Sequence, residues 1–518
     1  MALHNLGRSP GPSAIALPSL SVANAPAVVE GTGGTTALSF TVTRSGDTAR
    51  AVSCNWMVGS SGANPVNAAD FAGGVLPSGT LTIPAGASTG TITVAIAGDD
   101  IVEPDESVTV ILSNATMSIA VTQPGATATV LNDDAAPTVT ARIIAANRTD
   151  LPTTAINFAQ NTTARRVHYA SPEGTIGNLR TIDVGFYVSG ADALLYNAPA
   201  AVTIKRFVEY PSGVFTAVTW GGSPTTVIAP GATVTSDPVA LTIPAGAAFH
   251  ERTVVVSPSP NTMPTMQLPA GAATLGLPDG KIVADMGNTG TIAADNSVYS
   301  FGACAILGDV ARTAARGFVL IGDSIAFGQG DVGSTGSRGG SGWIGRGLDP
   351  LYPYAKIAVP GQGAAALASV IGGSQFAGLF AALGYTDVIE EHGINDLRVG
   401  RTPAQLQADL QSLYAPHVGK RIYQTTLTPR ADSGNGYADV AGQTPRTDGT
   451  MPMLASVNAA IRGRQANVTA IIEAADAAMS ARDSGVWGGP FPPVLDGTHP
   501  TSAKAAAMAT IVASAIAR

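Results

Sequence analysis

The chain has 518 residues, of which 12% are charged and 5% aromatic, with 60 glycines and 35 prolines. This length predicts several domains, and the composition favours β-rich modules with tight turns over a disordered chain or a coiled coil. The net charge of −8, without a dense Lys/Arg cluster, gives no reason to expect a nucleic acid partner.

The cysteines, the hydropathy and the first residues limit the class of protein further. Cys54 and Cys304 are the only cysteines, too few for a disulfide framework or a Cys-based metal site. No apolar stretch approaches the roughly 20 residues of a membrane span. Residues 1–18 show no recognisable signal peptide and are expected to be a lead-in or attachment arm. The composition nevertheless favours an extracellular, cell-surface or phage-particle location.

Residues 19–135 carry apolar side chains at every second position. Three such runs are Leu38, Phe40, Val42; Ile92, Val94, Ile96; and Val108, Val110, Leu112. Gly, Pro, Asn and Asp separate the runs. This pattern predicts a small antiparallel β-sandwich.

Acidic residues lie in the loops of this segment. The string Asp99-Asp100-Ile101-Val102-Glu103-Pro104-Asp105-Glu106 precedes one strand, and Asn132-Asp133-Asp134 closes the segment. With Glu30 and Asp70 in place, residues 19–135 resemble the Calx-beta domain, in which loop carboxylates at one end of the sandwich bind calcium. The resemblance implies a calcium site made from Glu30, Asp70, Asp99, Glu103, Glu106, Asp133 and Asp134.

The chemistry of these residues agrees with a cation, because calcium takes six to eight oxygen ligands and clustered carboxylates repel one another without one. Gly98 and Asn132 stand where many relatives of that family carry Asp. The alternative is therefore a set of solvated loop acids that hold no metal.

Residues 136–310 again alternate, with Ile182, Val184 and Phe186 followed by Val202 and Ile204. They predict a second antiparallel β-sandwich. Its passage Thr235-Ser236-Asp237-Pro238-Val239 resembles β-sandwich modules placed before esterase domains. A carbohydrate-binding module and a spacer both fit this segment.

The pattern changes at residue 311. Short apolar runs at Phe318–Ile321, Ile357–Val359, Val388–Ile389 and Ile422–Tyr423 alternate with predicted helices at Ala364–Ile371, Pro403–Tyr414, Met453–Arg462 and Thr501–Ala517. Alternation of this kind predicts a parallel sheet with helices on both faces, with functional residues at the carboxyl ends of the strands.

Four strings lie at these strand ends or before the last helix. They are Gly322-Asp323-Ser324-Ile325, Val359-Pro360-Gly361-Gln362-Gly363, Gly393-Ile394-Asn395-Asp396 and Asp496-Gly497-Thr498-His499-Pro500. In this order they make residues 315–518 resemble the SGNH (GDSL-type) hydrolases. The resemblance implies a three-layer α/β domain with a flavodoxin-like parallel sheet over residues 311–518.

The residue types explain the chemistry that the resemblance implies. A serine hydroxyl becomes nucleophilic only when a base removes its proton, and His499 suits that task for Ser324. Asp496 can accept from the imidazole and fix its tautomer. The family's oxyanion donors correspond to the Ser324 N–H, the Gly361 N–H and the Asn395 amide, with Gly363 as the alternative glycine. Asp323 is expected to shape the turn.

Two other motifs are set aside. Gly86-Ala87-Ser88-Thr89-Gly90 matches a nucleophile elbow but lies between two alternating strands, so it is predicted to be a hairpin turn. Gly328-Gln329-Gly330-Asp331-Val332-Gly333 matches a dinucleotide fingerprint without a following helix; residues 328–342 are expected to be a flexible loop ending at Trp343. His392 lies near Asn395, and a structural role is expected for it.

The leading hypothesis is a serine esterase, an acetylesterase of a carbohydrate, that needs no cofactor for catalysis. Acyl transfer follows from the residues, whereas the acetylated glycan follows only from the resemblance and the module order. The alternative hypothesis is a non-catalytic adhesion or particle-surface protein, whose calcium-stiffened sandwiches bind a glycan.

Overall fold

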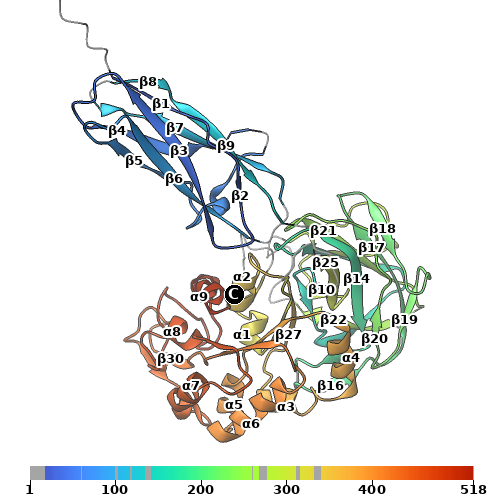
Figure 1. Cartoon of the computed structure of the whole chain (residues 1–518). Helices are drawn as coiled ribbons and strands as arrows, with labels where there is room; N and C mark the ends of the chain where they lie inside the picture. Colours follow the sequence, from blue (N-terminus) through green and yellow to red (C-terminus); the bar gives the residue numbers. More distant parts are fainter. Residues whose placement is uncertain are drawn as a thin grey trace, which may run out of the picture. The chain divides into compact units, whose positions relative to one another are not determined.

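The computed structural model describes residues 18–59, 61–62, 64–99, 103–116, 119–134, 142–258, 261–267, 277–310, 315–331 and 340–516. The chain forms two compact units, Met1–Pro137 and Thr138–Arg518, called here the N-terminal and C-terminal units (Figure 1). Within the described ranges, no helix is both long and apolar enough to cross a membrane.

The N-terminal unit is a two-sheet β-sandwich, as predicted. One sheet has the order β6-β3-β1-β8, and the other has the order β2-β9-β7-β4-β5. Alternate side chains of β3, β6 and β7 are buried in one shared core, because successive side chains of a strand point to opposite faces. The strands are β1 Ser19–Val22, β2 Val28–Val29, β3 Thr35–Ser45, β4 Val52–Gly59, β5 Ser78–Ile83, β6 Thr89–Ala97, β7 Glu106–Ser113, β8 Ala120–Gln123 and β9 Gly125–Leu131.

The turn that contains Ser88 is not a hairpin, contrary to the prediction. It joins β5 to β6, and these strands belong to different sheets of the sandwich. The period-2 pattern on either side of a turn shows that two strands are present but does not say whether they pair. The turn still contains no strand-to-helix elbow, so Ser88 remains an ordinary loop residue.

The first part of the C-terminal unit is a second set of antiparallel sheets. A six-stranded sheet of order β18-β17-β21-β13-β23, in which β19 also pairs with β17, faces the four-stranded sheet β10-β25-β14-β20, and both contribute side chains to one core. The strands are β10 Arg142–Ile144, β11 Thr149–Asp150, β12 Thr154–Phe158, β13 Thr162–Tyr169, β14 Ile176–Val184, β15 Phe186–Val188, β16 Leu195–Asn197, β17 Val202–Glu209, β18 Phe215–Val218, β19 Thr226–Ile228, β20 Thr233–Thr235, β21 Ala248–Val255, β22 Asn261–Gln267, β23 Gly280–Val283, β24 Tyr299–Ser300 and β25 Ala305–Val310.

The second part is the predicted parallel sheet. Its order is β11-β27-β26-β28-β29-β32, and every neighbouring pair is parallel. Without β11 this order reads 2-1-3-4-5, the flavodoxin-like arrangement. The strands after β25 are β26 Phe318–Gly322, β27 Tyr354–Ala358, β28 Asp387–Glu390, β29 Arg421–Thr425, β30 Ala431–Ser433, β31 Gln443–Pro445 and β32 Ala470–Ile472. Each of the four predicted parallel strands is present, and β32 escaped prediction.

The helices follow the predicted alternation. They are α1 Ser324–Phe327, α2 Gly342–Leu348, α3 Ala364–Ala368, α4 Ser374–Ala382, α5 Ile394–Arg398, α6 Pro403–Tyr414, α7 Leu454–Arg462, α8 Ala474–Ala478 and α9 Ser502–Ala515. Thr402 caps α6 through a capping box with Gln405, which is why its start is legible in the sequence. Residue 342 opens α2 and Trp343 is fully buried in it; most of the flexible loop expected at residues 328–342, namely 332–339, lies outside the described residues.

The predicted boundary between residues 310 and 311 does not separate two compact bodies. The sheet β10-β25-β14-β20 is buried on both faces: Ile306 packs in the core of the β-sheets, and its neighbour Leu307 packs in the core of the α/β part. In addition, β11 pairs with β27 at the edge of the parallel sheet. Residues 138–518 are therefore one compact unit.

We expect this sharing to make the C-terminal unit unfold in one transition. Ile306→Ala and Leu307→Ala should each lower its free energy of unfolding by about 2–5 kcal/mol, because each leaves a cavity on one face of the same strand. Denaturant unfolding of the full chain, followed by fluorescence and circular dichroism, measures this. The exposed Ile282→Ala is the matched control. Two separate transitions, one shifted by each core variant, would contradict the expectation.

Candidate active site

Ser324 lies where β26 meets α1. The strand ends at Gly322, Asp323 is the N-cap, and Ser324 is the first residue of the helix. A Cβ at position 322 would collide with Ala326 and with the Glu391 carboxylate, so only glycine fits this close turn. The fold therefore presents a serine at the carboxyl edge of the parallel sheet, where ligands of such sheets bind.

The backbone N–H groups around Ser324 are satisfied by two buried carboxylates. Asp323 accepts from the Ile325 N–H at 2.8 Å, as its expected role in the turn requires. Glu391 Oε2 accepts from the Asp323 N–H at 3.4 Å and from the Ala326 N–H at 3.2 Å. Within the described part of the chain, the Ser324 N–H receives no such partner. It is the donor at this turn that remains for an external oxygen.

Burial dominates the protonation of these carboxylates. It raises the pKa of Asp323, and it raises the pKa of Glu391 well above the ordinary value, with the Asp323 charge adding to the effect. A neutral Glu391 can accept the two N–H bonds without placing a second negative charge under the turn. No motif considered in the sequence singled out Glu391, which directly follows β28.

The loop before α9 carries the other two predicted residues. His499 Nε2 lies 2.8 Å from Ser324 Oγ, and His499 Nδ1 lies 2.5 Å from Asp496 Oδ2. The structure thus brings Ser324, His499 and Asp496 together in one hydrogen-bonded row. Asp496 Oδ1 also accepts from the backbone N–H groups of His499 and Thr498, at 2.9 and 3.0 Å.

The electrostatics of Asp496 favour the ionised form. Partial burial raises its pKa, but the hydrogen bonds from the His499 ring and from the two backbone N–H groups outweigh burial and hold the pKa well below its usual range. A carboxylate that stays ionised keeps the proton of the imidazole on Nδ1. His499 Nε2 is then free to accept the proton of Ser324.

The hairpin β30–β31, Arg446 and Trp487 hold this loop in place, and no motif considered above indicated their role. Gly497 has φ +83°, and a Cβ there would collide with the Ala431 carbonyl. The Gly497 carbonyl accepts from the Ala431 N–H and from Trp487 Nε1, both at 3.1 Å. Arg446 Nη2 donates to the Asp496 carbonyl at 3.0 Å. The aspartate and histidine are thus positioned by elements far from them in sequence.

The predicted oxyanion donors lie on neighbouring loops. Residues 359–362 form a turn closed by a bond from the Gln362 N–H to the Val359 carbonyl at 3.1 Å. Pro360 and Gly361, with φ +80°, occupy its centre, as a type II turn requires. Gly361 is exposed, whereas Gly363 is the N-cap of α3 and packs against Asp396. This arrangement favours Gly361, but the choice stays a prediction.

Asn395 is near the nucleophile but engaged. Its Nδ2 donates to Asp323 Oδ2 at 3.0 Å and to the Gln362 carbonyl at 3.1 Å. These bonds tie α5 to the Ser324 turn and to the turn of Gly361. An oxyanion would have to take one of the two amide hydrogens from its present acceptor, so the role predicted for Asn395 is untested by this geometry.

The remaining histidines of the C-terminal unit are structural. His392 is fully buried, and its Nδ1 lies 2.7 Å from Glu390 Oε1, consistent with the expected structural role. His417 contacts the Tyr385 hydroxyl, His168 contacts Glu251, and His250 Nε2 lies 2.8 Å from Arg165 Nη2. His4 lies outside the described residues.

The acidic residues of the N-terminal unit form a second candidate site. Asp70, Glu103 and Glu106 each place a carboxylate oxygen within 4.8 Å of the others. Glu30, Asp99 and Asp134 are close enough to act on them electrostatically, whereas Asp133 accepts from the Gly31 N–H at 2.9 Å. Six of the seven predicted ligands are therefore close enough for their charges to repel one another. The seventh, Asp133, instead supports the loop that carries Glu30.

Repulsion in this cluster changes the acid strengths. Burial, followed by the charges of Asp99 and Glu103, raises the pKa of Glu30 from 4.5 to about 7. Burial and the Asp70 charge likewise raise the pKa values of Glu103 and Glu106. Hard carboxylate oxygens in this density match the donor set of calcium, so the residues present fit such an ion.

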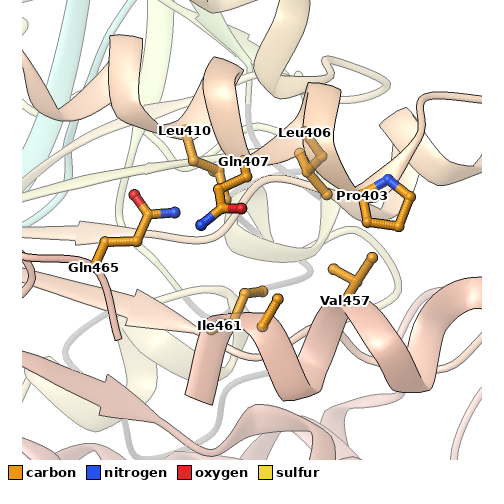
Figure 2. Close-up of a pocket in the computed structure, with 8 residues that line it drawn as sticks. Pro403, Leu406, Gln407, Leu410, Val457, Ile461 and Gln465 are labelled. Atoms are coloured by element: carbon orange, nitrogen blue, oxygen red, sulfur yellow. The ribbon is translucent and has the colours of Figure 1, made fainter. Parts of the chain in front are cut away.

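An apolar pocket lies between α6 and α7, on elements other than those of the Ser324 row. Figure 2 shows side chains of both helices around it, including Leu406, Leu410, Val457 and Ile461. Its volume is about 10 Å³, about the minimum for one water molecule. It is a packing gap rather than a ligand site.

Neither a protein-family model nor a curated protein sequence matches the chain. Solved structures match parts of it. The apo form of the Calx CBD1 domain is 22% identical, with 23% of this chain and 99% of that chain covered and a TM-score of 0.20. A Desulfitobacterium hafniense protein assigned to the G-D-S-L lipolytic family is 14% identical, with 38% and 98% covered and a TM-score of 0.28.

A salicylyl-acyltransferase from a tetracycline biosynthetic pathway is 11% identical, with 69% of this chain and 81% of that chain covered and a TM-score of 0.29. The similar structures thus include both Calx domains and G-D-S-L-type acyl-group enzymes, the two families that the sequence resembles. At such TM-scores the argument for function rests on the geometry described above.

The bonds of Glu391 generate a prediction about the Ser324 turn. Glu391→Gln keeps an oxygen acceptor and, because the native group favours its neutral form, changes little charge; Glu391→Ala leaves two buried N–H groups unpaired, at about 1–3 kcal/mol each. We expect the alanine variant to unfold at lower urea and to react more slowly with a fluorophosphonate at Ser324, and the glutamine variant to stay close to the parent. Equal damage from both variants would show that a charged carboxylate is needed.

Proposed function

We propose that the protein is a serine esterase that removes acyl groups, in particular acetyl groups, from a carbohydrate. One observation carries the proposal: Ser324 Oγ, His499 and Asp496 form a hydrogen-bonded row at the carboxyl edge of the parallel sheet. A nucleophile, a base in contact with it and a carboxylate that orients the base are the parts that acyl transfer through serine needs.

The reaction would run in two steps. Ser324 Oγ attacks the ester carbonyl while His499 Nε2 takes its proton, and the imidazolium is stabilised by Asp496. His499 then gives that proton to the alcohol that leaves, which forms an acyl-serine. A water molecule, deprotonated by the same imidazole, attacks the acyl carbon and releases the acid with the serine restored.

The negative oxygen of each tetrahedral intermediate needs donors. The Ser324 N–H, which bonds to none of the described residues, supports the first donor of the proposal. Gly361, on its exposed turn, and Asn395 complete the proposed oxyanion hole. Donors of this kind typically change the rate by roughly 10²–10³-fold each, so they account for much of the expected catalysis.

The acetylated glycan is proposed on the resemblance to SGNH hydrolases and on the β-module fused to the α/β part. An extracellular, cell-surface or phage-particle location would bring the enzyme to such a polymer. The antiparallel sheets share a core with the α/β part and therefore act as a fixed part of the enzyme.

Hydrolysis of p-nitrophenyl acetate tests the proposal. Ser324→Ala and His499→Ala should each lower kcat/KM by roughly 10³-fold or more, and Asp496→Asn should lower it strongly, because the three groups act as a unit. Ser88→Ala, in the exposed elbow-like motif of the N-terminal unit, is the matched control and should leave the activity unchanged.

A fluorophosphonate distinguishes the esterase from a non-catalytic adhesion protein. The probe should label the parent chain at Ser324 and fail to label Ser324→Ala. Labelling of that variant at another residue would refute the assigned nucleophile, and a parent chain that neither reacts nor hydrolyses the ester would favour the adhesion protein.

We also infer that the N-terminal unit binds calcium through Asp70, Glu103 and Glu106, with Glu30, Asp99 and Asp134 around them. The three carboxylates within 4.8 Å and the raised pKa of Glu30 support this inference. Loop carboxylates that repel one another at neutral pH gain the most from a divalent cation. Asp133 would act on the loop of Glu30 and not on the ion.

The sign of the pH dependence follows from these pKa values. Between pH 4.5 and about 7 the folded state holds protons on Glu30 that the unfolded state has lost, so stability without a cation falls as pH rises through this window. Calcium should remove the loss. The increase in melting temperature caused by calcium, relative to chelator, should therefore be larger at pH 8 than at pH 5.

Differential scanning fluorimetry of the full chain measures this effect, with Trp56 as the tryptophan of the N-terminal unit. Glu103→Gln with Glu106→Gln should abolish the calcium shift, and Asp47→Asn, an exposed acid outside the cluster, should preserve it. Identical melting in calcium and in chelator at both pH values would remove the inference.

A further inference from the structure

A cavity of about 250 Å³ lies beside the loop that carries Asp496 and His499. Arg430 and Arg446 line it, and both also hold the loop. Arg430 Nε donates to Thr498 Oγ1 at 3.2 Å, and Arg446 Nη2 donates to the Asp496 carbonyl at 3.0 Å. One wall of the cavity is thus in direct contact with the residues that flank the proposed base.

The charges around this cavity compensate one another. Asp448 lies 2.7 Å from Arg430, and Asp432 lies 2.9 Å from Arg446. Asp483, which also lines the cavity, lies 2.7 Å from an arginine outside it. The surroundings carry no excess of positive charge, so they do not favour an anion. The arginines present donors, because a guanidinium has more N–H groups than these bonds use, and the carboxylates present acceptors.

The rest of the lining is mostly apolar, with hydroxyl side chains beside the apolar ones. Met451, Pro452 and Leu454 contribute apolar surface, and Ser484 adds a hydroxyl. A sugar ring has the matching character, with hydroxyls at its edge and C–H groups on its faces. The cavity is smaller than the roughly 300–1,000 Å³ of sites for drug-sized ligands, which suits a single ring.

We propose that this cavity is a subsite for one neutral sugar ring of the esterified carbohydrate, a neighbour of the ring that bears the acyl group. The proposal rests on the proposed esterase function and names the class of its substrate. Binding energy gained on a ring other than the esterified one would align the reacting bond with Ser324. An acetylated oligosaccharide should then be a better substrate than the acetylated monosaccharide.

Filling the cavity tests the proposal without touching Arg430 or Arg446. Ala455 lines the cavity from the exposed first turn of α7, so Ala455→Trp places an indole there at little risk to the fold. Ala459→Trp, exposed one turn later and outside the lining, is the matched control. The substrates are acetylated xylotetraose, chitotetraose and mannotetraose, the corresponding acetylated monosaccharides, and p-nitrophenyl acetate.

We expect the parent enzyme to prefer at least one tetrasaccharide over its monosaccharide. Ala455→Trp should lower kcat/KM for that tetrasaccharide by about tenfold or more, mainly through KM, and should leave p-nitrophenyl acetate and the monosaccharide unchanged. Ala459→Trp should change none of the three.

Other outcomes overturn the proposal in distinguishable ways. An enzyme that hydrolyses p-nitrophenyl acetate but prefers no tetrasaccharide, or whose preference survives Ala455→Trp, is an esterase without this subsite. Inhibition by inorganic phosphate or sulfate that Ala455→Trp relieves would identify an anion site instead. A parent chain inactive on every ester would refute the esterase function itself.

Discussion

The 2.8 Å contact between His499 Nε2 and Ser324 Oγ joins residues 175 positions apart in the chain. It connects the turn after β26 with the loop before α9, so it exists only if the parallel sheet and the final helix are both in place. Everything else at the site serves that contact: Glu391 satisfies the turn below the serine, and the hairpin β30–β31 fixes the loop that carries the imidazole.

Both units contain carboxyl groups whose ionised form is disfavoured by burial and by neighbouring negative charge. The two units differ in what satisfies these groups. Beneath Ser324, burial raises the pKa of Glu391 well above its ordinary value and so favours the neutral form, whose oxygen accepts N–H bonds without adding charge. In the N-terminal unit, Glu30 and its neighbours are less deeply enclosed and repel one another. The carboxyl group of Glu391 is thus satisfied by N–H groups of the protein, whereas the carboxylates around Glu30 are suited to a cation.

Local pattern was enough to predict the strand that ends before Ser324 and the helix that follows His499, whereas the short helices α1 and α5, which carry Ser324 and Asn395, were not predicted. The apolar run at 318–321, the helical stretch at Pro403–Tyr414 and the period-2 alternation in β3, β6 and β7 each depend on nearby residues, and the structure has them. What depended on distant pairing was not predictable. The turn at Ser88 crosses between sheets, β11 joins a sheet formed by residues two hundred positions later, and β30–β31 braces a loop near the C-terminus.

The sheet β10-β25-β14-β20 packs against a core on each face, because Ile306 and Leu307 anchor β25 in opposite layers. Such a sheet is not an independent module that can be removed or replaced without exposing its neighbours. A chain that began at residue 318 would expose an apolar face and the unpaired edge of β27 on the α/β part, and both features promote aggregation.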